Sequence, residues 1–221
     1  MAPDTIAQRV ERVRERIASA CKRSGRAPDE VTLIAVTKGF GPDAVREAMA
    51  AGVRDLGENR VQEAQAKIPA LANVDATWHM IGHLQTNKVK TALHLFAIIQ
   101  SVDSLHVAQE ISRRALREVP VFLEVNISSE PTKHGLSLEE LPGRYQAIAG
   151  LPNLDVRGLM TVAPVVPRPE DARPVFQRLR REAEQLGLSA LSMGMTDDFE
   201  VAIEEGATHV RVGRAIFGER G

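Results

Sequence analysis

Residues 31–36 are Val-Thr-Leu-Ile-Ala-Val, a short apolar run that is rich in β-branched side chains. Such a run indicates a strand that is buried on both faces of a sheet. Gly39, Gly41 and Pro42 follow it, and Pro42 suits the first turn of a helix that we predict over 43–51. This stretch therefore predicts a buried strand followed by a helix, which is the repeating unit of parallel α/β folds.

The same strand-turn-helix unit recurs along the rest of the chain. Further strands are predicted at 53–56, 77–81, 96–102, 121–125, 156–159, 190–192 and 209–212. The helices predicted after them cover 58–67, 86–93, 104–117, 138–149, 169–186, 197–205 and 214–217. Eight such units in 221 residues average about 28 residues each, which is close to the length of one βα unit in a (β/α)8 barrel.

This alternation predicts an α/β protein with one domain over residues 1–221, a (β/α)8 TIM barrel. An open doubly wound sheet is the alternative, but no GxGxxG motif follows a predicted strand. Ile6, Val10, Val13 and Ile17 have helical spacing and predict an additional amphipathic helix over 4–24. Because the last predicted helix is short, we expect this N-terminal helix to cover the space beside it.

Composition excludes several classes of protein. Lys and Arg total 28 against 29 Asp and Glu, and aromatic residues make up only 4%, so we expect no nucleic-acid partner. The single cysteine, Cys21, excludes an internal disulfide and a Cys-rich zinc cluster. No apolar stretch approaches the roughly 20 residues that span a bilayer, and the N-terminal segment lacks a signal-peptide core. We expect a cytoplasmic protein with no membrane partner.

Lys38 is the main candidate for covalent chemistry. It follows the first predicted strand, and active sites of (β/α)8 barrels lie at the C-terminal ends of the strands. Partial desolvation there favours the neutral amine that Schiff-base chemistry requires. The alternative is a lysine that extends its charged end into solvent.

A second candidate site combines Ser192, which ends the seventh predicted strand, with Gly213 before the terminal helix. Barrel phosphate sites commonly use the loops after strands 7 and 8 and the N-terminus of a short helix. The alternative is a glycine that only turns the chain and a serine that caps a helix. Since strand 8 pairs with strand 1 in a closed barrel, Arg211, Gly213 and Lys38 would share one corner. This corner suits a ligand that carries both an aldehyde and a phosphate.

Other polar residues are assigned structural roles. His79 and His83 have i, i+4 spacing, but they are predicted on a loop and lack the HExxH pattern. We therefore expect them to form hydrogen bonds within the loop, and we predict no metal site. Asp197 and Asp198 open a predicted helix, where capping is favoured over acid/base catalysis.

Several stretches match motifs of a known family. They are Ala-Val-Thr-Lys at 35–38, Gly-Glu-Asn-Arg-Val-Gln-Glu at 57–63, Trp-His-Met-Ile-Gly-His-Leu-Gln-Thr-Asn-Lys at 78–88, Leu-Ser-Met-Gly-Met-Thr-Asp-Asp-Phe at 191–199 and Glu-Gly-Ala-Thr-His-Val-Arg-Val-Gly at 205–213. Over nearly its whole length the chain resembles the pyridoxal phosphate homeostasis proteins. The resemblance implies a barrel of fold-type III, like the N-terminal domain of alanine racemase, that carries pyridoxal 5′-phosphate (PLP).

The resemblance also implies roles for individual residues. Lys38 matches the Schiff-base lysine, Arg211 matches the arginine that faces the pyridine nitrogen, and Asn59 matches an asparagine near the cofactor. Ser192, Gly213 and Arg214 match the phosphate cradle.

The sequence departs from the family pattern at two positions. Arg214 stands where a small Ser or Thr is usual, and this adds a charge. His134 stands where a small residue is common, in a segment that keeps Lys133.

Three functions are compatible with these residues. The permanent charge of Arg211 weakens PLP as an electron sink, and a racemase needs a second acid/base group. We expect no second domain to supply that group, and Tyr145 is predicted on the outside of the barrel. The favoured hypothesis is a PLP carrier that buffers the cofactor or delivers it to PLP-dependent apo-enzymes without efficient catalysis. The alternatives are a weak amino-acid racemase or other PLP enzyme, and a PLP-free Schiff-base aldolase. We expect a monomer or weak dimer.

Overall fold

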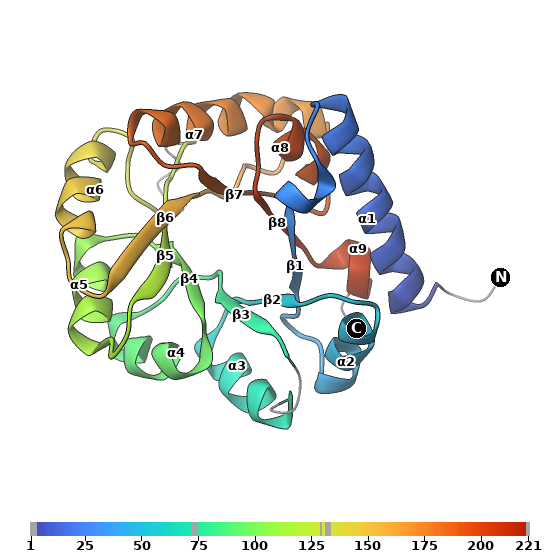
Figure 1. Ribbon diagram of the computed structural model, residues 1–221, viewed down its shortest axis with the longest axis horizontal. Coiled ribbons are helices and arrows are strands. Elements are labelled where there is room, and N and C mark those ends of the chain that lie inside the picture. The colour runs from blue at the N-terminus through green and yellow to red at the C-terminus, as the bar shows by residue number, and fades with distance from the viewer. Residues whose placement is uncertain (1–3, 72–74, 129, 131–133, 220–221) are drawn as a thin grey trace.

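A computed structural model describes residues 4–71, 75–128, 130 and 134–219 of the chain. Within these residues, eight parallel strands close into a barrel in the order β1 to β8 (Figure 1). The strands are β1 (Thr32–Val36), β2 (Asp55–Glu58), β3 (Thr77–Met80), β4 (Ile98–Val102), β5 (Val119–Glu124), β6 (Leu154–Met160), β7 (Ala190–Met195) and β8 (His209–Val212). The prediction of a (β/α)8 barrel is confirmed.

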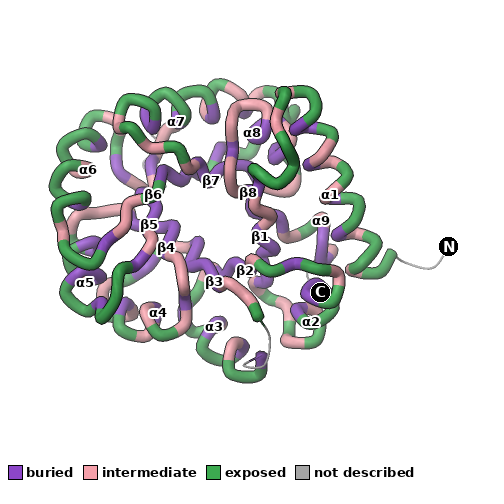
Figure 2. The backbone as a smooth tube through the Cα atoms, in the orientation of Figure 1, coloured by how far each residue is buried: buried purple, intermediate pink, exposed green. Residues whose placement is uncertain are grey.

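Helices surround the barrel and connect its strands. They are α1 (Ile6–Arg23), α2 (Pro42–Ala50), α3 (Val61–Lys67), α4 (Val89–Leu95), α5 (Leu105–Arg114), α6 (Leu141–Ala149), α7 (Arg173–Gln185), α8 (Phe199–Glu204) and α9 (Arg214–Phe217). Short 3-10 helices cover Pro28–Glu30, Ile68–Leu71, Thr86–Lys88 and Pro169–Ala172. Figure 2 shows buried residues on the strands and on the helix faces turned toward them, with exposed residues outside. None of the described helices is both long and apolar enough to cross a membrane.

The N-terminal helix α1 begins at a capping box. The Thr5 hydroxyl accepts a hydrogen bond from the Gln8 backbone N–H, and the Gln8 side chain accepts one from the Thr5 N–H. Val10, Val13 and Ile17 on one face of α1 are buried, and the helix packs against α8, α9 and α2. The prediction that this helix covers the space beside the short terminal helix is therefore confirmed.

The barrel closes through pairing of β1 with β8. Ile34 lies beside Arg211, and Ala35 lies beside Val212. This register brings the C-terminal ends of the two strands together, as the sequence analysis predicted. The loop after β1 and the start of α9 consequently lie on the same side of the molecule.

Two predicted strand boundaries were wrong in ways that affect the site. The second strand was predicted at 53–56 but covers Asp55–Glu58, so Glu58 lies in the strand and not in a helix. A Cβ on Gly57 would lie 2.8 Å from the Ile81 side chain, so this glycine permits close packing within the sheet. The seventh strand was predicted to end at Ser192 but continues to Met195.

Candidate functional site

A cavity of about 300 Å³ opens at the C-terminal ends of β1 and β8. Lys38 lines it from the loop after β1, Thr196 from the loop after β7, and Arg211, Gly213 and Arg214 from the end of β8 and the start of α9. The structure thus brings together four residues that the sequence analysis selected and adds Thr196.

Lys38 is half-buried on a tight turn. Gly39 has a φ of +79°, a conformation that favours glycine, and its N–H donates to Glu63 Oε2 at 3.2 Å. The N–H of Phe40 donates to the Thr37 carbonyl at 3.0 Å. These bonds fix the backbone on both sides of the lysine, so its amine is presented from a defined position.

A buried ion pair is hydrogen-bonded to the residue before this turn. Lys67 Nζ donates to Glu58 Oε1 and, at 2.7 Å, to the carbonyl oxygen of Thr37. The Thr37 hydroxyl donates to the same Glu58 oxygen at 2.5 Å. Glu58 is fully buried and Lys67 nearly so. The sequence analysis missed this pair, because it placed Glu58 at the start of a helix.

Arg211 is a buried charged group that lines the cavity, and it is only 4% exposed. Its Nη1 donates to Ser192 Oγ and its Nη2 donates to the Thr161 carbonyl oxygen, both at 2.7 Å. Burial lowers the pKa of Arg211 to about 10, while the carboxyl groups of Glu124 and Asp198 oppose that shift. Its guanidinium is therefore still protonated at neutral pH.

A chain of buried hydrogen bonds extends from Arg211 through the barrel interior. The Ser192 hydroxyl donates to Gln100 Oε1 at 2.6 Å, and Gln100 Nε2 lies 3.0 Å from His79 Nδ1. His79 Nε2 lies 2.9 Å from Asp55 Oδ1. The four side chains come from β7, β4, β3 and β2. The orientation of Arg211 thus depends on polar groups from across the barrel.

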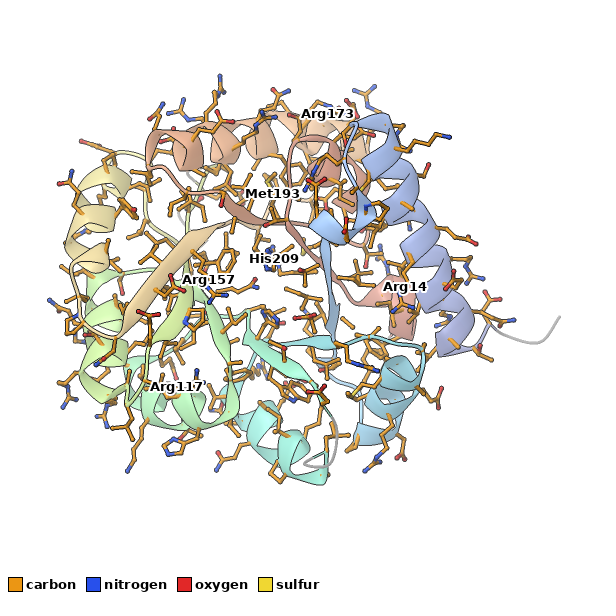
Figure 3. The ribbon with its side chains drawn as sticks, viewed as in Figure 1. Arg14, Arg117, Arg157, Arg173, Met193 and His209 are labelled. Atoms are coloured by element: carbon orange, nitrogen blue, oxygen red, sulfur yellow. The ribbon has the colours of Figure 1, made fainter. Side chains whose placement is uncertain are left out.

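His209 is a further polar group inside the ring of strands (Figure 3). Its Nδ1 lies 2.8 Å from the Thr208 hydroxyl, and its ring meets the Phe122 ring edge-on at 5.1 Å. Burial, with a smaller contribution from His79, lowers the pKa of His209 to about 4. The imidazole is therefore neutral at physiological pH.

Ser192 does not line the cavity with Lys38. It is fully buried in the middle of β7, where its hydroxyl accepts from Arg211 and donates to Gln100. Thr196 instead follows the end of β7 and lines the cavity, and its Oγ1 accepts a hydrogen bond from the Ala215 N–H at 3.4 Å. The alternation of Leu191, Met193 and Met195 is the sequence signal that could have extended the strand to reveal Thr196.

The start of α9 packs closely against β1. A Cβ on Gly213 would lie 3.4 Å from both the carbonyl oxygen and the Cβ of Val36. The exposed guanidinium of Arg214 pairs with the Asp197 carboxylate. The rings of Phe40 and Phe217, from the β1 loop and α9, stack with centroids 5.0 Å apart. The charge that Arg214 adds is thus balanced by an acidic residue of the β7 loop.

Asn59 does not line the same cavity as Lys38. It is half-buried after β2 and lines a neighbouring cavity of about 550 Å³, together with His83 and Lys88. Its Oδ1 is buried and has no hydrogen-bond partner among the described residues. A buried acceptor normally has a hydrogen-bond partner, so Asn59 Oδ1 is one of few exceptions among the described residues.

Comparison with known proteins assigns the family. The model of the alanine racemase N-terminal domain matches residues 8–221. The chain is 45% identical over 222 residues to the pyridoxal phosphate homeostasis protein of Aquifex aeolicus, covering 96% of this chain and 97% of that protein. The chain belongs to the pyridoxal phosphate homeostasis protein family. The resemblance seen in its motifs is thereby confirmed.

Solved structures agree with this family assignment. PipY of Synechococcus elongatus, a structure with PLP bound, is 39% identical with a TM-score of 0.83, over 93% of this chain and 100% of PipY. Alanine racemase of Corynebacterium glutamicum is 16% identical with a TM-score of 0.70, over 95% of this chain and 62% of the racemase. The likeness to the racemase shows the shared barrel fold.

Three details differ from the predictions made from the sequence. The strand predicted at 77–81 is confirmed over Thr77–Met80, so His79 lies in β3 and placing it on the loop with His83 was wrong. Asp198 occupies the N-cap position of α8, yet its Oδ1 accepts from the Met195 N–H at 2.6 Å and caps no helical N–H. His83 forms a hydrogen bond, but its partner Asp103 belongs to the loop after β4 and not to the loop of His83. Lys133 lies outside the described residues.

Proposed function

We propose that this chain binds PLP in the cavity between β1 and β8 and takes part in intracellular PLP homeostasis, by buffering or delivering the cofactor. The observation that carries the proposal is the cavity itself. It combines a lysine on a fixed turn, a buried arginine and the glycine at the start of α9. The names of relatives that match this chain over nearly its full length give the same function.

The residues present fit PLP group by group. PLP supplies, when bound, an aldehyde that condenses with primary amines. Lys38 provides such an amine at the cavity wall. Gly213 allows close backbone approach, while the Thr196 hydroxyl and the Arg214 guanidinium are donors suited to a phosphate. Asn59 lines the neighbouring cavity, and we propose that it approaches the cofactor from that side.

We assign Ser192 a supporting role in this site. Its hydroxyl is committed to Arg211 and Gln100, so it holds the guanidinium in place, and Thr196 takes the phosphate contact. Arg211 then provides a permanent positive charge that disfavours protonation of the pyridine nitrogen. An unprotonated ring stabilises carbanions poorly, and this favours holding the cofactor over turning over amino acids.

The partners that fit this role are PLP-dependent apo-enzymes. We propose that the protein acts in the cytoplasm as a monomer or weak dimer and that it has no nucleic-acid partner. The near-zero net charge of −1 supports the last point, because nonspecific binding to nucleic acid depends on an excess of basic residues.

Borohydride reduction of the PLP-loaded protein, followed by peptide mass mapping, tests the binding site. A pyridoxyl group is expected on Lys38, and the visible absorbance of bound PLP should disappear in Lys38→Ala. Lys90→Ala, which removes an exposed lysine of α4, is the matched control and should keep both signals. Labelling of Lys88 or Lys133 in place of Lys38, or a protein that stays colourless with added PLP, would contradict the assignment.

Transfer of PLP to an apo-enzyme tests the delivery role. The recovered activity of the acceptor should rise faster with the loaded protein than with the same concentration of free PLP. Equal rates would leave buffering as the function. Multiple turnovers of a single-enantiomer amino acid that vanish in Lys38→Ala would instead establish the racemase alternative.

A further inference from the structure

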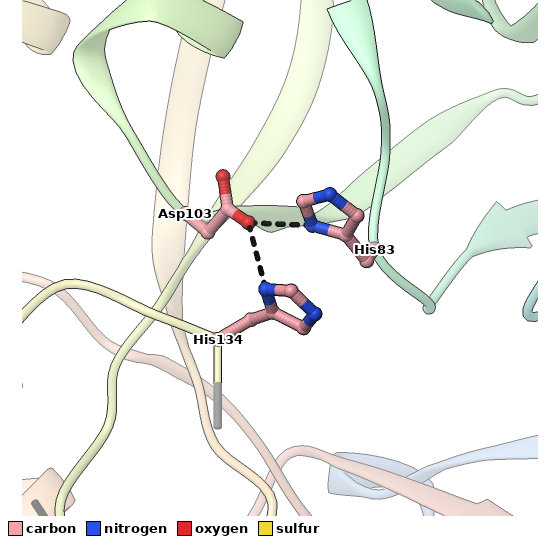
Figure 4. A group of neighbouring side chains, drawn as sticks. All are labelled: His83, Asp103 and His134. Atoms are coloured by element: carbon pink, nitrogen blue, oxygen red, sulfur yellow. Dashed lines mark hydrogen bonds and ion pairs between the residues drawn. The ribbon is translucent and has the colours of Figure 1, made fainter. Parts of the chain in front are cut away.

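Three side chains from neighbouring loops converge beside the barrel mouth (Figure 4). They are His83 after β3, Asp103 after β4 and His134 between β5 and α6. Asp103 Oδ2 lies 2.8 Å from His83 Nδ1 and 3.9 Å from His134 Nδ1. The two imidazole rings stack almost in parallel, with centroids 4.0 Å apart and an interplanar angle of 13°. One ligand atom from each residue lies within 4.8 Å of the others.

These separations suit coordination of a metal ion. Two ligands bound at about 2.0–2.1 Å in a tetrahedral zinc site are roughly 3.3 Å apart. The observed distances of 2.8 Å and 3.9 Å lie on either side of that value. Because the lone pair of an imidazole nitrogen lies in the ring plane, the two stacked rings must turn apart for both Nδ1 atoms to face one ion. The 3.9 Å distance is too long for a hydrogen bond. Hydrogen bonding to Asp103 therefore does not account for the position of His134.

The burial and charge of the cluster also favour a cation. The Asp103 side chain is 9% exposed, whereas His83 and His134 are 39% and 58% exposed, so an ion can enter from solvent past the two rings. A second carboxyl group, Glu124, lies close enough for Asp103 to contribute to its raised pKa. The raised pKa of Glu124, about 7, leaves that group partly neutral at neutral pH, so Asp103 is the carboxyl group that the cluster offers to a cation.

We propose that His83, Asp103 and His134 form a binding site for one divalent transition-metal ion of the Zn²⁺ type, with a coordination position left open to solvent. Two imidazoles and a carboxylate are ligands that such ions accept, and three protein ligands leave room for water or another small donor. The site is separate from the cavity of Lys38 and does not depend on PLP binding. His83 acts here with His134, its neighbour in space, and not with His79, its neighbour in sequence.

Zinc titration of the cofactor-free protein, produced without a histidine tag, tests the proposal. Calorimetry or competition with a chromogenic chelator should give one Zn²⁺ per chain. His83→Ala and His134→Ala should each weaken binding at least tenfold. His106→Ala, which removes an exposed histidine of α5, is the matched control and should leave the affinity unchanged. Thermal unfolding followed by circular dichroism confirms that each variant is folded.

The cofactor site provides a second control. Lys38→Ala should keep the wild-type zinc affinity although it loses PLP, which separates failure of this proposal from failure of the proposed function. With Co²⁺ as the probe, the visible absorption of the bound ion should change in His134→Ala. Absence of zinc binding, wild-type affinity in either His83→Ala or His134→Ala, or loss of zinc binding in Lys38→Ala would overturn the proposal.

Discussion

The Arg211 guanidinium donates a 2.7 Å hydrogen bond to the hydroxyl of Ser192, on the adjacent strand. Both residues are buried, and the hydroxyl in turn donates to Gln100. Ser192 thus accepts from a charged group while it donates to a neutral one. This relationship places a serine of the family motif underneath the arginine that we propose contacts the pyridine ring.

Replacing Ser192 by Ala should destabilise the protein and perturb PLP binding together. A buried charged donor that loses its acceptor costs about 1–3 kcal/mol, so the free energy of unfolding should fall by roughly 2 kcal/mol. The absorption maximum of bound PLP should also shift, because Arg211 is less firmly held. Urea unfolding and visible spectroscopy measure the two effects. Ser19→Ala, at an exposed position on α1, should change neither, and an unshifted spectrum in Ser192→Ala would argue against the supporting role.

The buried pair of Glu58 and Lys67 gives a second prediction. Lys67→Met leaves the Glu58 carboxylate buried without its cation, and breaking such a pair typically costs about 3–5 kcal/mol. The double variant Glu58→Gln with Lys67→Met removes the unpaired charge and should recover a large part of that loss. Urea midpoints of the wild type and the two variants provide the test. A cost below 1 kcal/mol for the single variant would mean that water reaches this pair.

Glu124 should make stability depend on pH. Burial, with a contribution from the Asp103 carboxylate, raises the pKa of Glu124 to about 7 from the ordinary value of 4.5, while Arg211 and His83 oppose the shift. The folded state therefore binds more protons than the unfolded state between these values. The contribution of protonated Glu124 to the free energy of unfolding is fully present below about pH 4.5, and it is lost as the pH rises through about 7.

Glu124→Gln should remove this dependence. Relative to the wild type, the variant should gain roughly 3 kcal/mol in unfolding free energy between pH 4 and pH 8. The measurement is urea unfolding of the cofactor-free protein in buffer that contains a metal chelator. A constant difference between the two proteins across this range would show that the Glu124 carboxyl group titrates normally.

The sequence sufficed for the fold because each buried strand carries its own local signal. Runs such as 31–36 are mostly apolar, and the helices after them have a periodic apolar face. Pairing of the first and last strands then followed from closure of the barrel, and it placed Lys38, Arg211 and Gly213 at one corner. The family motifs added Arg214 and the cofactor.

The missed features depend on contacts between distant segments. Gly57 lies inside β2 because the side chains of Ile34 and Ile81 occupy the space beside it, whereas glycine in sequence indicates a turn. The strand β7 likewise continues through Gly194, so Ser192 was placed at a strand end. The hydrogen-bond chain from Ser192 to His79 passes through Gln100, and these three residues belong to three different strands. No local pattern could predict it.

The last prediction concerns Gly82. Its lack of a side chain lets the loop after β3 lie against the loop after β2. A Cβ at Gly82 would lie 2.3 Å from the backbone oxygen of Asn59, so Gly82→Ala must displace that segment. We expect a loss of about 1–3 kcal/mol in unfolding free energy, as for other overpacked positions. We also expect a weaker affinity for PLP, because the substitution displaces Asn59, which we propose as a cofactor contact.

Gly143→Ala is the matched control for this substitution. Gly143 lies in α6, and an added Cβ there would meet no heavy atom within 4 Å beyond its chain neighbours and the backbone of its own helix. Alanine favours helix over glycine by up to about 1 kcal/mol, so this variant should be slightly more stable than the wild type and should bind PLP equally well. Calorimetric PLP titration and urea unfolding of both variants separate the two effects. If Gly82→Ala is destabilised but keeps wild-type PLP affinity, the Asn59 segment serves only the packing of the barrel mouth and makes no contribution to holding the cofactor.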